Sequence, residues 1–239
     1  MKLIVAGATG LVGSELIKQS LQMSAITQVI ALARKPVQID NVDSSKLKNV
    51  TIKDYGEYSE QVRSELAAAD ACIWTVGVTP LKSKSFDFSE VKRICQDCTL
   101  VGFKTIYEAG SRRPFRFVYF SGEGIMEDPG AKKPFFLGDY MIMRSRTEAM
   151  VRKLPEEYQG IEVCVARPGM ITSSNTWARA AMASAFSATN FFTRAIPNVT
   201  LEEVSSAVLN QIVNGFEKEV LSNADLVRLG QAAYEVKET

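Results

Sequence analysis

Histidine is absent from the 239 residues of this chain, and its absence excludes several kinds of active site. Triads in which histidine activates serine or cysteine, imidazole acid–base catalysis and histidine-ligated metal sites all need that side chain. Proton chemistry would therefore use tyrosine, lysine, serine, cysteine or a carboxylate.

Cysteine is scarce, and its four residues lie in apolar segments rather than in loops (Cys72, Cys95, Cys98 and Cys164). We expect them to be buried thiols in a reducing compartment. Cys95 and Cys98 have C-x-x-C spacing, but the second ligand pair that a zinc site needs is missing. We therefore predict no metal site.

The chain also lacks excess charge and long apolar runs. Its 28 Lys and Arg nearly balance 27 Asp and Glu, so no overall field favours nucleic acid or a membrane surface. No run approaches the roughly 20 apolar residues of a membrane span. The first apolar run begins at Leu3, which leaves no room for a signal or transit peptide. We expect a cytoplasmic protein that binds neither nucleic acid nor a membrane.

The most informative stretch is the glycine-rich turn near the start of the sequence. The apolar residues 3–6 predict a buried strand, and a helical pattern begins at Leu11. Three glycines between strand and helix are typical of a dinucleotide pyrophosphate cradle at a helix N-terminus. The spacing is G-x-x-G-x-x-G, and a glycine turn in another kind of α/β protein is the alternative. The predicted phosphate-binding residues are Gly7, Thr9, Gly10, Leu11, Val12 and Gly13.

Apolar strand segments alternate with helical patterns along the chain. The predicted strands are residues 3–6, 29–33, 50–52, 71–76, 115–120 and 161–166. The predicted helices include residues 88–109, 140–154, 175–192 and 201–213. This alternation predicts an α/β fold with a doubly wound parallel sheet, the Rossmann fold. We predict a single domain over residues 1–239, with a nucleotide-binding core (1–170) and a C-terminal helical substrate lobe (171–239).

Arg34 and Lys35 follow the second predicted strand, about 20 residues after the glycine turn, where the group that meets the adenosine ribose is expected. An acidic residue there would bind the 2′-hydroxyl of NAD, whereas two cations favour the 2′-phosphate of NADP(H). A solvated basic turn is the alternative.

Residues at the ends of two further strands are predicted to contact the cofactor. Asp54 and Tyr55 follow the third strand, where the adenine edge is expected, although a turn-forming aspartate explains Asp54 equally well. The end of the fourth strand should line the cofactor crevice through Thr75, Val76 and Gly77.

Three residues together could carry acid–base chemistry. Ser121 ends the fifth strand, and Tyr140 and Arg144 share one face of a helix because they are four residues apart. Ser121 could hydrogen-bond a substrate carbonyl while Tyr140 donates a proton, with Arg144 lowering the tyrosine pKa. A strand-end cap and a surface helix residue are the alternatives for Ser121 and Tyr140.

These motifs, with Arg167-Pro168-Gly169 and Glu148, resemble the atypical short-chain dehydrogenase/reductases, in particular their NmrA-like and Tat-interacting-protein-like NAD(P)-binding branch. The resemblance covers residues 1 to about 170. It implies a Rossmann fold, NADP(H) as ligand, a Ser–Tyr–Lys type of site, and cofactor contacts at Pro168, Gly169 and Met170. The family normally carries lysine where this chain has Arg144, which can bind the ribose but cannot readily release a proton.

Two hypotheses follow. The first is an NADP(H)-dependent oxidoreductase acting on a carbonyl or polarised double bond of a small apolar metabolite, or a redox-neutral isomerase or cyclase using the same residues. Its substrate pocket would involve residues 80–88, residues 124–139 and the helix carrying Trp177, Met182 and Phe186. The second is a non-catalytic NADP(H)-sensing interaction protein, because of Arg144 and an Ala-rich helix that could form a homodimer or bind a partner.

Overall fold

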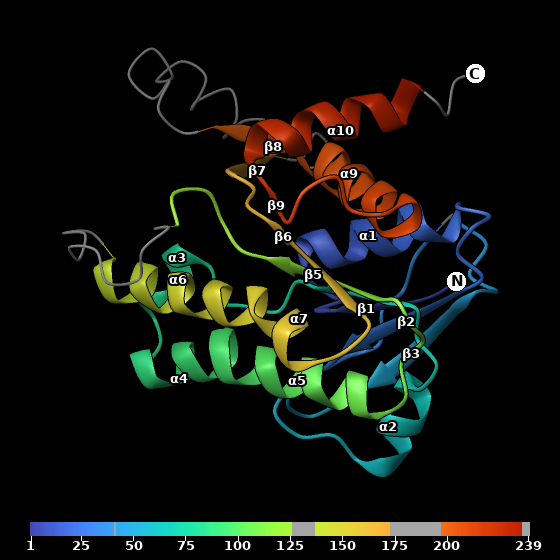
Figure 1. Ribbon diagram of the computed structural model, residues 1–239, viewed down its shortest axis with the longest axis horizontal. Coiled ribbons are helices and arrows are strands. Elements are labelled where there is room, and N and C mark those ends of the chain that lie inside the picture. Colours follow the sequence, from blue (N-terminus) through green and yellow to red (C-terminus); the bar gives the residue numbers. More distant parts are fainter. Residues whose placement is uncertain (41, 126–136, 173–196, 236–239) are drawn as a thin grey trace.

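A computed structural model describes residues 1–40, 42–125, 137–172 and 197–235 (Figure 1). Its main sheet has seven parallel strands in the order β3-β2-β1-β4-β5-β6-β9. Their bounds are β1 Lys2–Ala6, β2 Gln28–Ala33, β3 Leu47–Thr51, β4 Ala71–Trp74, β5 Phe115–Phe120, β6 Ile161–Ala166 and β9 Val220–Leu221. The chain winds outward from β1 in both directions, which confirms the predicted doubly wound Rossmann fold.

Helices cover both faces of this sheet (Figure 1). One layer contains α1 (Leu11–Leu21), α9 (Leu201–Asn214) and α10 (Asn223–Glu235). The other layer contains α2 (Glu60–Leu66), α4 (Phe88–Lys92), α5 (Cys98–Glu108), α6 (Gly138–Arg152) and α7 (Leu154–Glu157). A short helix, α3 (Pro80–Ser83), follows β4. Within the described residues, no helix combines the length and apolar character needed to cross a membrane.

The sheet separates two hydrophobic cores because successive strand residues point to opposite faces. In β1, Leu3 and Val5 pack toward α1 and α9, whereas Ile4 and Ala6 pack toward α5. All four are fully buried, as expected for a strand covered on both sides. The continuous apolar run in the sequence therefore has a direct structural cause.

Several elements differ from the sequence prediction. The helix expected over residues 88–109 is divided by a π-helical turn, η1 (Arg93–Asp97). The third strand begins at Leu47, earlier than expected, because the polar residues Lys48 and Asn49 pair with β2 on the sheet edge. The two-stranded sheet of β7 (Met170–Thr172) and β8 (Asn198–Thr200) was not predicted.

The C-terminal segment contributes to the main sheet as well as to the helical layer. β9 pairs with β6, and apolar residues of α9 share a core with α1. Helix α9 begins with the predicted capping box, in which Thr200 and Glu203 each bond the other's backbone N–H. The division at residue 170 stays a prediction, and the helix expected over residues 175–192 lies outside the described residues.

Candidate functional site

The three glycines of the turn have different physical roles. Gly7 has φ +82°, and a Cβ there would lie 2.5 Å from Oγ1 of Thr75 at the end of β4. A Cβ at Gly13 would collide with the backbone of Gly7 and Ala8, so helix and turn pack together only because Gly13 lacks a side chain. A Cβ at Gly10 would meet only the Gly7 carbonyl oxygen, at 3.1 Å. Gly10 therefore leaves open space where backbone can approach a phosphate.

The N-terminus of α1 is suited to binding an anion. Gly10 is the N-cap, and among the described residues no side chain caps this end and no acidic residue lies in its first turn. The first N–H groups of a helix have no partner inside the helix and carry partial positive charge. Those of Leu11, Val12 and Gly13 belong to this turn, as predicted for a pyrophosphate site.

The glycine turn opens onto a pocket of about 420 Å³ at the carboxyl ends of the strands. Many of the predicted cofactor-binding residues line it together, from the segments that follow β1, β2, β3 and β4. The lining residues are Gly7, Thr9, Gly10, Arg34, Asp54, Tyr55, Thr75, Val76, Gly77, Val78, Lys82, Phe86, Glu90, Arg93, Ile94 and Cys98. The structure thus brings residues as far apart in the chain as Gly7 and Cys98 into the crevice where doubly wound sheets bind nucleotides.

Tyr55 braces the glycine turn. Its hydroxyl donates to the Leu32 carbonyl at 3.2 Å and accepts the Gly7 N–H, also at 3.2 Å. Its ring meets Trp74 edge to face with centroids 5.8 Å apart. Burial raises the pKa of Tyr55 to about 12, so it is a neutral hydrogen-bonding group. Tyr55 therefore fixes the turn against β2 as well as lining the pocket.

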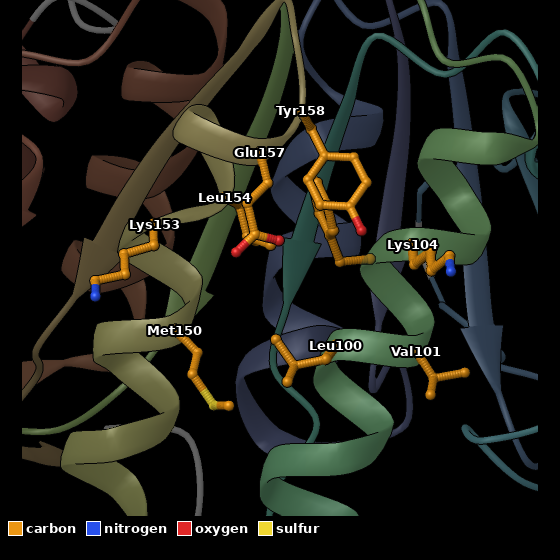
Figure 2. A pocket seen from close by; sticks show the side chains of 9 residues that line it. Leu100, Val101, Lys104, Met150, Lys153, Leu154, Glu157 and Tyr158 are labelled. Carbon is orange, nitrogen blue, oxygen red and sulfur yellow. The ribbon is translucent and has the colours of Figure 1, made fainter.

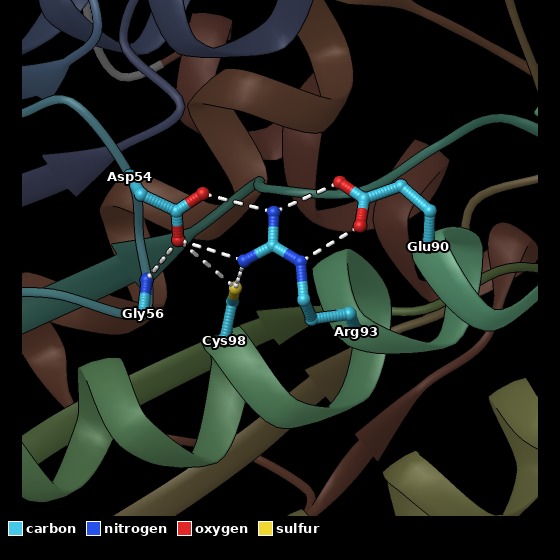
Figure 3. Close-up of polar contacts among 5 residues, drawn as sticks. All are labelled: Asp54, Gly56, Glu90, Arg93 and Cys98. Atoms are coloured by element: carbon cyan, nitrogen blue, oxygen red, sulfur yellow. Dashed lines mark hydrogen bonds and ion pairs between the residues drawn. The ribbon is translucent and has the colours of Figure 1, made fainter.

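Asp54 is held by a guanidinium that sequence reasoning missed (Figure 3). Arg93 bonds both oxygens of Asp54 at 2.9 Å and both oxygens of Glu90 at 2.8 Å. Asp54 also accepts the Gly56 N–H at 2.7 Å, so the turn-forming role and the pocket-lining role coexist. Hydrogen bonding from Arg93 lowers the pKa of Asp54. One wall of the pocket is thus formed by the carboxylates of Asp54 and Glu90 and by Arg93, whose guanidinium pairs with both.

The two cations predicted after β2 differ in placement. Arg34 and Lys35 are both exposed, but only Arg34 is among the lining residues of the pocket. Lys82, on α3, lines the pocket instead. The described lining therefore holds two cations from different elements, Arg34 and Lys82, and a cofactor contact of Lys35 stays a prediction.

Tyr140 and Arg144 both point from α6 toward the carboxyl ends of central strands. The Tyr140 hydroxyl donates to the Val78 carbonyl at 2.9 Å, and Val78 lines the pocket. Arg144 donates to the Phe120 carbonyl at 2.7 Å and lies 5.1 Å above the Tyr119 ring. Both side chains are buried, which excludes the surface-helix alternative for Tyr140. They lie beside the pocket rather than in its lining.

The electrostatic expectation for Tyr140 is corrected in one respect. Burial raises the pKa of Tyr140, and this effect outweighs the opposing attraction of Arg144. The net pKa of Tyr140 is therefore raised, because a buried phenolate loses its hydration. The positive charge of Arg144 acts in the predicted direction but is the smaller influence.

Ser121 lies at the end of β5, next to the segment that follows β6. Its Oγ is buried and has no hydrogen-bond partner in the part of the chain that the structure describes. Its N–H donates to Ala166, and the Glu123 N–H donates to Pro168. A buried hydroxyl without a partner costs free energy, which a substrate oxygen could recover.

The segment Pro168, Gly169 and Met170 is fixed by β8 and by α10. The Gly169 N–H donates to the Asn223 side chain at 2.8 Å, and Met170 N–H donates to the Pro197 carbonyl. A Cβ at Gly169 would collide with the Pro197 carbonyl, which explains the glycine. These residues do not line the 420 Å³ pocket; they lie at the end of β6, beyond β5 in the sheet.

A second groove, of about 320 Å³, lies between α5 on one side and α6 and α7 on the other (Figure 2). Leu100, Val101 and Met150 give it apolar walls, and Tyr158 lies at one end. It has no residue in common with the glycine-turn pocket. Sequence reasoning assigned no function to it.

Part of the predicted substrate pocket falls outside the described residues, including Trp177, Met182, Phe186 and residues 126–136. Of residues 80–88, Lys82 and Phe86 line the cofactor pocket. The four cysteines are buried free thiols, as expected. The Cys95 thiol accepts the Val78 N–H at 3.2 Å, so it supports the turn after β4.

Sheet order, glycine turn and pocket together define a Rossmann fold with a crevice of the kind that binds nucleotides. A profile of the NAD(P)H-binding family matches residues 7–212, and the chain belongs to that family. The chain is 28% identical over 149 residues to "Protein FMP52, mitochondrial" of Candida albicans. That match covers 56% of this chain and 62% of the relative, so the chain spans less than two thirds of the relative's length.

Solved structures share the fold at low sequence identity. MoeE5 in complex with UDP-glucuronic acid and NAD has a TM-score of 0.69 and 17% identity, covering 93% of this chain and 76% of its own. A short-chain dehydrogenase/reductase of Saccharomyces cerevisiae has a TM-score of 0.66 and 13% identity, covering 95% and 98%. The prediction of an NAD(P)-binding Rossmann protein is confirmed, and the chain shares its fold with a short-chain dehydrogenase/reductase.

Proposed function

We propose that this protein is an NADP(H)-dependent short-chain oxidoreductase that acts on a carbonyl or polarised double bond of a small apolar metabolite. The observation that carries the proposal is the glycine turn sharing one pocket with Arg34, at the end of β2. No carboxylate follows β2 until Asp40, so the acidic residue typical of NAD binding is missing from this position.

The residues present fit the cofactor. Gly10 leaves space for the pyrophosphate, and the first N–H groups of α1 would hold it. Arg34 would bind the 2′-phosphate through a charge-assisted fork. Asp54, Val76 and Gly77 would line the adenine and ribose, and Pro168, Gly169 and Met170 would meet the nicotinamide end.

When bound, a reduced nicotinamide would supply the hydride that adds to the carbonyl carbon. Ser121 Oγ donates a hydrogen bond to the substrate oxygen, which uses its unfilled bonding capacity. Tyr140 donates its phenolic proton to the same oxygen as the C=O π bond becomes a lone pair there. Arg144 stabilises the resulting phenolate by its charge, and the proton is restored from solvent because arginine cannot supply it.

The sensor function is the second candidate, and the hydrogen bonds of the two α6 residues favour it. Tyr140 is engaged by the Val78 carbonyl and Arg144 by the Phe120 carbonyl, so turnover requires Tyr140 to change partner. A sensor would bind NADP(H) without consuming it, and its partner affinity would depend on the cofactor's redox state. Partner binding that ignores the cofactor would exclude this candidate.

Replacing Arg34 by glutamate is expected to reverse cofactor preference. Glutamate repels a 2′-phosphate and accepts hydrogen bonds from a free 2′-hydroxyl, so NADPH affinity should fall about 100-fold while NADH affinity changes little or rises. Fluorescence titration of both nucleotides against wild type and variant measures this. Lys35→Glu is the matched control, since that neighbouring cation does not line the pocket. Wild-type protein that binds NADPH no tighter than NADH would contradict the cofactor assignment.

The proposal also includes a cytoplasmic location and a homodimer as one assembly of the enzyme. Cell fractionation tests the first, and sedimentation velocity at micromolar protein tests the second.

A further inference from the structure

The charged residues of the cofactor pocket fall into two groups. Asp54, Glu90 and Arg93 are bonded to one another at 2.8–2.9 Å and together carry one net negative charge (Figure 3). Arg34 and Lys82 also line the pocket, and among the described residues neither side chain forms an ion pair or hydrogen bond. Among the described residues that line the pocket, these two cations are therefore available to a ligand.

Arg34 and Lys82 lie on opposite sides of the glycine turn. Arg34 directly follows β2, and Lys82 belongs to α3, which follows β4. In the sheet, β2 and β4 are the two neighbours of β1, and the glycine turn follows β1. A phosphate held at the turn thus has one unpaired cation on each side.

A single cation does not balance the charge of a phosphate group bound in this pocket. A phosphate monoester carries nearly two negative charges at neutral pH. The net negative charge of the Asp54–Arg93–Glu90 wall opposes binding of such a group. A second cation offsets that repulsion, and an ammonium on a flexible stem suits a phosphate because it needs no fixed geometry.

We propose that Lys82, rather than Lys35, is the second phosphate-binding cation of the cofactor pocket. The inference rests on the proposed function, since it assumes a phosphate-bearing dinucleotide at the glycine turn. Lys82 is exposed at its own position, so its replacement leaves the cores intact. Lys82 would contact the ligand from α3, which is not part of the strand, glycine turn and helix that predict dinucleotide binding from the sequence.

The test titrates NADPH and NADH into wild type, Lys82→Gln and the matched control Lys35→Gln. Lys82→Gln is expected to weaken NADPH about 10-fold, whereas Lys35→Gln changes it less than 2-fold. Lys82→Arg is expected to restore most of the affinity, because it keeps the charge. Thermal unfolding without nucleotide should be unchanged in all variants.

The two nucleotides separate the sources of phosphate. A loss confined to NADPH places Lys82 at the 2′-phosphate, and an equal loss with NADH places it at the pyrophosphate; both support the proposal. Unchanged affinity in Lys82→Gln, or an equal loss in Lys35→Gln, would overturn it. Wild-type protein that binds neither nucleotide would instead overturn the proposed function.

Discussion

Tyr140→Phe is expected to lower the rate of carbonyl reduction by about 100- to 10,000-fold, the range that a positioned acid contributes. The substitution removes one oxygen, which donates to the Val78 carbonyl in the protein without ligand. NADPH affinity should change little, because Tyr140 does not line the pocket. The measurement is NADPH consumption with a panel of small apolar carbonyl compounds. Equal rates for wild type and variant would contradict the acid role.

The pH dependence adds a sharper criterion. Burial holds the pKa of Tyr140 above its ordinary value of 10.0, so the acid form persists throughout the neutral range. The reduction rate should therefore not fall from tyrosine ionisation until the pH exceeds about 10. Tyr107→Phe is the matched control, since Tyr107 lies at the C-terminal end of α5 and does not line the cofactor pocket. Its variant should keep wild-type turnover.

Glu148→Ala is expected to lower the free energy of unfolding by about 3–5 kcal/mol, since it removes the buried carboxylate that pairs with the largely buried Arg167 guanidinium. Glu148 is 2% exposed and bonds Arg167 Nε at 3.0 Å. The pair joins α6, which carries Tyr140, to the segment that leads into Pro168 and Gly169. Urea unfolding followed by circular dichroism measures the loss.

An exposed glutamate on α5 gives the control. Glu108 forms an i,i+4 ion pair with Lys104 at 3.7 Å, and its side chain is 48% exposed. Glu108→Ala should cost only about 0.3–0.5 kcal/mol, because solvent screens such a pair. Equal losses in Glu148→Ala and Glu108→Ala would show that the buried pair does not brace the site.

The fold was predictable where local pattern and long-range packing agree. The strands at residues 115–120 and 161–166 are predicted at their observed bounds because both faces are buried and the apolar run is continuous. β9 has only two residues and depends on pairing with β6, so no local pattern marks it. Likewise, the polar edge strand β3 obtains its first residues from pairing with β2.

Site residues were predictable from the sequence where the backbone conformation or close packing permits only one residue type. Gly7 and Gly13 are readable because their roles depend on turn geometry and close packing. Arg93 was not, because its partner Asp54 lies 39 positions away and only the fold brings them together. Lys82 was missed for the same reason: it lies in a different loop from Arg34, and only the fold brings the two residues to one pocket.

The central claim is that the glycine turn holds the phosphates of a nicotinamide dinucleotide, and Gly10→Val tests it most directly. Gly10 has φ −75° and ψ 167°, which any residue adopts, and its Cβ would meet only the Gly7 carbonyl oxygen. We expect the variant to fold after a small shift of that oxygen, which the Cβ would approach to 3.1 Å. The valine side chain would occupy the space that the pyrophosphate needs at the N-terminus of α1. Titration should therefore show an NADPH affinity reduced about 100-fold or more, and the thermal unfolding temperature should change little. Wild-type affinity in a folded Gly10→Val protein would contradict the account.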